Sequence, residues 1–192
     1  MAASPVEGDA THDFFTVDML FLQRLYILFL IELGSRRVHL AGCTANPDAD
    51  WVTRQARQFS WHLQDGDPGS GRYLLHDRDG TFAAGFDTVF ASEGVEVMET
   101  PVRAPNAHAY AERPVRSIRE ECLDHLRIRN QPHLLLVLRR YLVHYNQRRP
   151  HQGLGQQPPV PIVELLQSPA VPERVRCRPV LGGLIRDDHL AA

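Results

Sequence analysis

Apolar residues in the first hundred positions come in short runs separated by turn residues, a pattern that predicts β-strands. Three runs, 13–17, 25–33 and 36–43, are rich in aromatic, β-branched and aliphatic side chains. Their connections are short, so we expect an antiparallel meander. Two further apolar runs, 72–77 and 95–98, predict a fourth and a fifth strand.

Helical spacing of apolar residues appears between and after these runs. We expect helices over 51–63, 82–93, 111–126 and 132–146, with Asp50 as the N-cap of the first. The order β-β-β-α-β-α-β-α-α predicts an α/β fold in which helices cover a five-stranded mixed sheet.

The length of 192 residues and a hydrophobic content of 43% suit one globular domain. We divide the chain into a disordered N-terminal segment (1–11), a core domain (12–160) and a C-terminal tail (161–192). Apolar runs such as 26–31 are too short to cross a bilayer, so we expect a cytoplasmic protein that contacts no membrane. The three cysteines form no CxxC pair, which argues against structural zinc and a disulfide framework.

Charge is unevenly distributed along the chain, although the net charge is only −2. Residues 1–100 carry 7 Arg against 15 Asp and Glu, whereas residues 101–160 carry 10 Arg against 4 acids. An acidic half followed by a basic half is typical of a metal-dependent enzyme that acts on a polyanion. A solvated helical face rich in arginine is the alternative explanation.

Three carboxylates stand where the predicted elements could bring them together. Asp13 begins the first strand, Asp77 ends the fourth, and Glu112 lies at the start of an arginine-rich helix. Phosphodiester cleavage by two metal ions needs carboxylates that hold the ions roughly 3.5–4 Å apart. Magnesium prefers such oxygen ligands. The pattern therefore predicts a magnesium site for phosphoryl transfer.

Four segments carry a resemblance to a known family: DFFTVDMLFLQRLYILFLIELGSRRVHLAG, LLHDRDGTF, TPVRAPNAHAYAER and HYNQRRPHQGLGQQPP. Residues 13–159 resemble the integrase catalytic core of DDE transposases and retroviral-type integrases, of the bacterial insertion-sequence type. The resemblance implies a ribonuclease H-like fold and DNA strand cleavage and strand transfer with Mg²⁺ or Mn²⁺. It also implies binding of element-end and target DNA, a homo-oligomer, and a bacterial cytoplasmic location at the nucleoid.

The resemblance also assigns residues. Asp13, Asp77 and Glu112 would be the catalytic metal ligands, with Asp18 as an alternative to Asp13 and Asp79 as a turn residue. His151 either contacts DNA or fixes a turn. Four arginines would meet DNA phosphates, or else are ordinary surface charge: Arg113, Arg116, Arg119 and Arg127.

Three positions depart from the family pattern: Asn106, His108 and Pro114. A proline is tolerated in the first helical turn and disrupts later turns, so we expect Pro114 to delay the helix start to about 110–113. The chain also shows no N-terminal helix-turn-helix of the kind such transposases use. Two hypotheses stay open. The chain is an active DDE-type polynucleotidyl transferase, or it is a catalytically impaired remnant that binds DNA or oligomerises.

Overall fold

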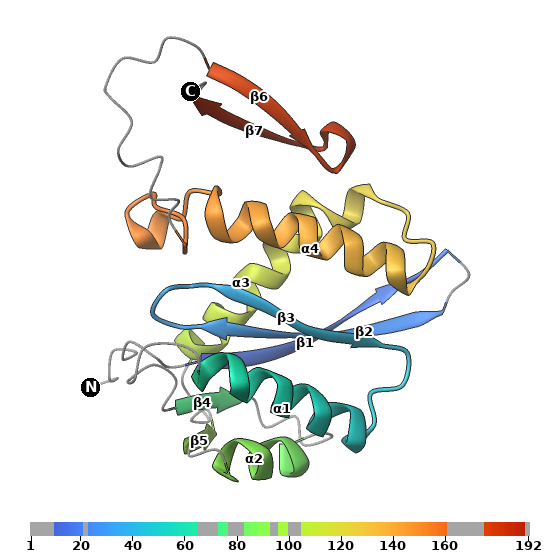
Figure 1. Cartoon of the computed structure of the whole chain (residues 1–192), viewed down its shortest axis with the longest axis vertical. Coiled ribbons are helices and arrows are strands. Elements are labelled where there is room, and N and C mark those ends of the chain that lie inside the picture. Colours follow the sequence, from blue (N-terminus) through green and yellow to red (C-terminus); the bar gives the residue numbers. More distant parts are fainter. Residues whose placement is uncertain are drawn as a thin grey trace.

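The computed structural model describes residues 10–20, 23–64, 73–76, 83–92, 96–99, 105–160 and 175–190. Figure 1 shows the arrangement of its strands and helices. In chain order they are β1 (Ala10–Asp18), β2 (Arg24–Glu32), β3 (Val38–Thr44), α1 (Ala49–Gln64), β4 (Tyr73–His76), α2 (Ala83–Ser92), β5 (Glu96–Glu99), α3 (Pro105–Glu121), α4 (Gln131–Gln147), β6 (Val175–Val180) and β7 (Ile185–Leu190).

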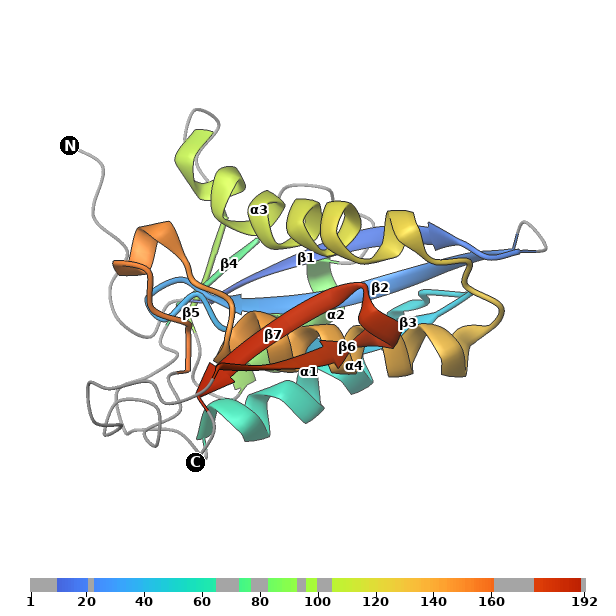
Figure 2. The same cartoon turned by 90° about the horizontal axis from the view of Figure 1, so that it is seen from above.

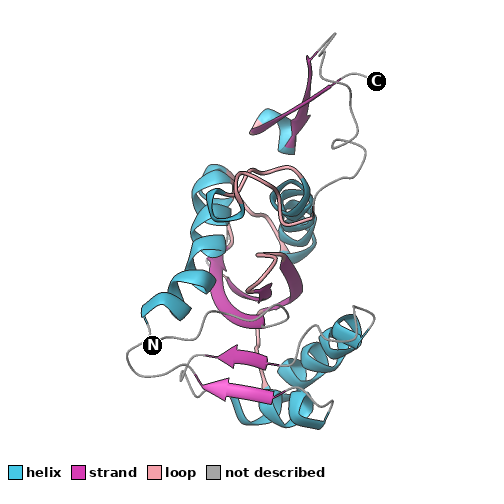
Figure 3. Cartoon of the chain, turned by 90° about the vertical axis from the view of Figure 1, so that its left-hand side faces the viewer, coloured by secondary structure: helices cyan, strands magenta, loops and turns pink. Residues whose placement is uncertain are grey.

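The first five strands lie in the order β3-β2-β1-β4-β5, with β1 in the middle. β1, β2 and β3 pair antiparallel, as the short connections predict, whereas β4 pairs parallel to both β1 and β5. Helices α1 and α2 lie on one side of the strands, and α3 and α4 lie on the other (Figures 1 and 3). The predicted α/β class is confirmed.

The apolar run of β2 is continuous because this strand is buried on both faces. Its residues alternate between two cores, as the two-residue period of a strand requires. Leu28 and Leu30 pack with Val52 and Ala56 of α1, and with α2. The larger core, formed with α3 and α4, takes the alternate side chains Leu25, Ile27, Phe29 and Ile31.

Helix α1 starts two residues earlier than the sequence suggests. Its cap is Asp48 rather than Asp50, because the Asp48 Oδ1 accepts the backbone N–H of Trp51 at 2.7 Å. Asp50 lies inside the first turn instead, where a carboxylate is favoured by the helix dipole.

Helix α3 corrects the prediction for Pro114. The helix begins at Pro105, so Pro114 is its tenth residue and the expected start at 110–113 is wrong. Proline cannot donate the helical hydrogen bond to the carbonyl of Tyr110, and it crowds that carbonyl. The helix continues because its packing outweighs this local cost: Pro114 itself is buried, and Ile118 one turn later is fully buried in the larger core.

Helix α4 protects the outer edge of β3. Near its N-terminus, the Gln131 side chain donates to the Cys43 carbonyl at 2.7 Å. Near its C-terminus, the Asn146 amide accepts from the Val38 N–H at 2.9 Å and donates to the Val38 carbonyl at 2.8 Å. These amides take the place of a further strand at both ends of β3, which blocks edge-to-edge pairing there.

A two-stranded hairpin of β6 and β7 lies beside α4 (Figure 1). The hydrophobic pattern predicts no strand in this C-terminal segment. Leu181 and Ile185 pack against the larger core, and the buried Asp187 forms an ion pair with Arg148 of α4. Within the described part of the chain, no helix combines the length and apolar character needed to cross a membrane.

Candidate catalytic site

The three predicted carboxylates differ in how far the structure describes them. Asp13 lies in the middle strand β1. Asp77 follows His76, the last residue of β4, and lies outside the described residues. Glu112 is exposed on α3. Among described side chains no three His, Cys, Asp or Glu gather as a metal site, and the side chains of Asp13 and Asp77 lie outside that set.

The pairing of β1 with β4 bears directly on two of these residues. Ala10 pairs with Leu74 and Thr11 pairs with Leu75, so paired residues differ by 64 in sequence number. Asp13 and Asp77 differ by the same 64. Asp18 does not share this offset. It lies at the far end of β1, where its Oδ1 accepts from Arg24 Nε at 2.9 Å.

Arg119 fastens α3, the helix of Glu112, to β1. Its Nη2 donates to the Thr16 carbonyl at 2.7 Å, and its Cζ lies 5.3 Å from the centre of the Phe15 ring. A charged hydrogen bond and a cation–π contact thus join the two elements. This arginine is one of the predicted DNA contacts, and the structure places part of its guanidinium group inside the fold.

A shallow hollow of about 390 Å³ lies along the side of α3 that carries Arg119. Charged residues dominate its lining: Glu112, Arg116, Arg119, Glu120 and Asp124, with Val115 between them. The remaining predicted DNA contacts, Arg113, Arg116 and Arg127, are all exposed. Their side chains are therefore accessible to a polyanion.

A second set of interactions holds α3 against the end of α4. Glu121 accepts from Arg149 Nε at 3.0 and 3.1 Å and from Arg149 Nη2 at 2.5 Å. The Tyr141 hydroxyl donates to the same carboxylate at 2.7 Å. Burial alone would raise the pKa of Glu121, but the hydrogen bonds from Arg149 and Tyr141 hold this pKa below its usual value. Glu121 is therefore charged at neutral pH.

The string HYNQRRPHQGLG, which carries much of the family resemblance, has a structural role here. His151 is buried, its Nε2 bonds the Tyr145 carbonyl at 3.0 Å, and its ring meets the Tyr145 ring edge-on at 4.6 Å. Burial lowers the pKa of His151, which favours the neutral ring. His151 was expected either to contact DNA or to fix a turn, and in the structure it fixes a turn. Gly155 supplies the left-handed backbone, at φ 61°, that ends this turn.

Glu121 and Asn146 are the residues that sequence reasoning missed. Asn146 is part of the string that signals the family, but nothing in the string says that its partner is the edge of β3. Arg149 in the same string needs a carboxylate partner in a half-buried position. The sequence offers four acids between positions 101 and 160 and does not single out Glu121.

Solved structures with a similar arrangement of strands and helices include an intasome chain, integrase catalytic core domains and a transposase catalytic domain. A chain in the structure of a simian T-cell lymphotropic virus intasome in complex with PP2A regulatory subunit B56 gamma matches at a TM-score of 0.63. The identity is 13%, over 98% of this chain and 68% of that chain. The integrase catalytic core domain of HTLV-2 in complex with magnesium matches at 0.57 with 14% identity, over 79% and 93%. The catalytic domain of Mos1 mariner transposase matches at 0.58 with 14% identity, over 71% and 70%.

The fold is therefore that of integrase and transposase catalytic cores, because likeness at such low identity shows the fold. In the sequence, residues 93–159 match the family model of the integrase core domain. The resemblance predicted from the motifs is confirmed, and this chain is similar to integrase cores in both sequence and fold. A comparison with curated protein sequences gives no match.

Proposed function

We propose that this chain is the catalytic core of an integrase or transposase that cuts DNA strands and joins them to a target. The observation that carries the proposal is the register of β1 against β4. Their constant offset of 64 residues is also the separation of Asp13 and Asp77. Facing residues of adjacent strands lie about 4.8 Å apart and point to the same side of a sheet. Two carboxylates in that relation suit a shared pair of divalent ions.

In this proposal Glu112 is the third ligand, and the position of α3 beside β1 (Figure 2) supports this assignment. Glu112 precedes Arg119 by two helical turns, about 10 Å along the axis at 1.5 Å per residue. Asp13 precedes Thr16 by three strand residues, also about 10 Å. Arg119 bonds the Thr16 carbonyl, and α3 runs alongside β1 (Figure 2). Counting back about 10 Å along each element from the Arg119–Thr16 contact reaches Glu112 on α3 and Asp13 on β1, which supports a shared site for the two residues.

The donor set fits magnesium or manganese, because Asp13, Asp77 and Glu112 offer hard carboxylate oxygens. A bound pair of ions would stabilise the attacking and leaving oxygens of the phosphodiester. The chain's own contribution would be to hold these carboxylates in place, with Asp13 on β1 and Glu112 on α3. Its exposed arginines Arg113 and Arg116 would hold the DNA backbone beside them, and the exposed Arg127 would be a further contact. We infer homo-oligomers as well, since two DNA ends must be joined to one target.

Cleavage and strand transfer on labelled duplexes that end in the repeats flanking the gene test this proposal. With Mg²⁺ or Mn²⁺, we expect Asp13→Asn, Asp77→Asn and Glu112→Gln each to abolish both reactions. Asp18→Asn is the matched control, because it removes a carboxylate from the same strand without the 64-residue offset. Loss of activity in Asp18→Asn with activity retained in Asp13→Asn would refute the assignment.

A further inference from the structure

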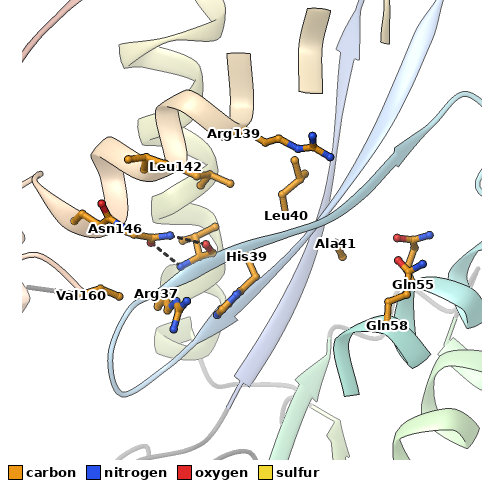
Figure 4. Close-up of a pocket in the computed structure, with 13 residues that line it drawn as sticks. Arg37, His39, Leu40, Ala41, Gln55, Gln58, Arg139, Leu142, Asn146 and Val160 are labelled. Atoms are coloured by element: carbon orange, nitrogen blue, oxygen red, sulfur yellow. Dashed lines mark hydrogen bonds between the residues drawn. The ribbon is translucent and has the colours of Figure 1, made fainter. Parts of the chain in front are cut away.

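A groove opens along the outer edge of the sheet, between α1 and α4, with β3 as its floor (Figure 4). Its volume is about 450 Å³. Arg139 and Leu142 reach toward it from α4, while Gln55 and Gln58 line it from α1. β3 is two strands away from β1, so the groove lies about 10 Å across the sheet from the candidate catalytic carboxylate.

The charged side chains in the lining of this groove are basic. Arg37 and Arg139 are exposed at its rim, and none of its thirteen described lining residues is aspartate or glutamate. The acid beside the groove is Glu32, and its carboxylate bonds His39 at 2.7 Å and Ser35 at 2.5 Å. Glu32 also interacts electrostatically with Arg37 and so offsets part of its charge. A lining that carries two exposed arginines and no acid of its own still attracts polyanions.

Hydrogen-bonding groups add to this charge. Side-chain amides from both helices line the groove, and Gln55, Gln58 and Gln147 are among them. Amides and arginines are the groups that commonly contact DNA phosphates and sugars. The apolar side chains of Leu40 and Leu142 between them suit the carbon atoms of deoxyribose.

A protein strand is a poorer fit, because α4 already caps the edge of β3. Asn146 bonds both backbone groups of Val38, and Gln131 bonds the Cys43 carbonyl. An added strand needs a row of free backbone groups, and these side chains occupy both ends of that row.

We propose that this groove, defined by Arg37, Arg139 and the amides around them, binds the sugar-phosphate backbone of duplex DNA. It is a second DNA contact, separate from the candidate catalytic carboxylates. The proposal extends the proposed function by giving the core a place for a second stretch of duplex. Its test does not depend on catalysis, because the contact needs neither metal nor a scissile end.

The experiment measures binding of a fluorescein-labelled 30-base-pair duplex of arbitrary sequence, in EDTA, by fluorescence anisotropy between 50 and 200 mM salt. Arg37→Ala with Arg139→Ala removes two contacts, so we expect the log–log salt slope to become shallower by about 1.8. Six to ten phosphate contacts correspond to a 10³–10⁵-fold loss of affinity over this salt range, which is about threefold per contact. The double variant should therefore lose about tenfold less affinity than the wild type across the range.

Arg178→Ala with Arg186→Ala is the matched control, since it removes two exposed arginines of the hairpin that lie outside the groove lining. Arg37→Lys with Arg139→Lys should keep the wild-type slope, because the charges remain. An Ala double variant that behaves like the hairpin control would overturn the proposal. So would a change in its oligomeric mass by light scattering with DNA affinity intact, which would identify a protein interface. Normal groove-dependent binding by a protein that cleaves no DNA would refute the proposed function alone.

Discussion

Removing the Asn146 side chain should destabilise the fold strongly, although Asn146 lies far along the chain from every candidate catalytic residue. Asn146→Ala leaves the N–H and the carbonyl of Val38 without partners, and Val38 is only 2% exposed. Each unsatisfied buried group costs about 1–3 kcal/mol. Because Asn146 itself is half-buried and water can reach part of the site, we expect a total loss of about 2–4 kcal/mol. For a chain of this size that corresponds to a fall in Tm of about 5–15 °C.

Circular dichroism melts and urea titrations measure this loss. Asn146→Asp keeps the acceptor for the Val38 N–H and loses the donor to the Val38 carbonyl, so its loss should be intermediate. Gln147→Ala, one position further along α4, leaves both Val38 bonds intact and should change stability by less than about 0.5 kcal/mol. Amide exchange at Val38 should quicken in Asn146→Ala. Equal melts for Asn146→Ala and Gln147→Ala, with unchanged protection of Val38, would refute the reasoning.

Three further measurements follow from the same structure. Pro114→Ala should raise Tm by about 2–4 °C in a thermal melt. Removing the proline relieves about 3 kcal/mol of helix disruption, which exceeds the stability lost through reduced apolar burial and through a more flexible unfolded chain. A fall in Tm would contradict this. Arg149 lowers the pKa of Glu121. The free energy of unfolding of the wild type should therefore exceed that of Glu121→Gln above pH 4.5, and the difference should vanish as pH falls through the lowered pKa. A difference that does not change with pH would contradict this. Millimolar Mg²⁺ or Mn²⁺ should raise the Tm of the wild type and not of Asp13→Asn; equal shifts in the two proteins would exclude Asp13 as a ligand.

The elements of this fold were predictable where a local pattern decides them. The period of two along β2 and the short connections of the meander are local properties, and both strands and pairing agree with the prediction. The prediction was wrong where distant packing decides. Pro114 should stop a helix by its own chemistry, but burial of the helix against the larger core carries α3 from Pro105 through it. The hairpin was missed because its strands depend on contacts with α4, among them the ion pair of Asp187 with Arg148.

The candidate site shows the same division between local pattern and distant contact. The charge distribution and the sequence motifs identified Asp13, Asp77 and Glu112 as candidates. The pairing of β1 with β4 at an offset of 64 residues independently supports the first two. Sequence reasoning could not foresee that Arg119 bonds the Thr16 carbonyl, since the partner is 103 residues away. From sequence alone, an arginine on a helix is predicted to be a surface charge or a phosphate contact. Its bond to a strand becomes evident only when the strand packed against the helix is known.

The contacts made by the string HYNQRRPHQGLG therefore lie at a distance from the candidate catalytic carboxylates. Asn146 ties the end of α4 to β3, while Arg149 ties it to Glu121 at the end of α3. Arg119 then ties α3 to β1, two turns after Glu112. The three links form one continuous path from the edge of the sheet, through both helices, to the middle strand. A carboxylate on α3 can hold a constant distance from a carboxylate on β1 only if α3 itself is fixed at more than one point. The string supplies one of those points, and Arg119 supplies the other.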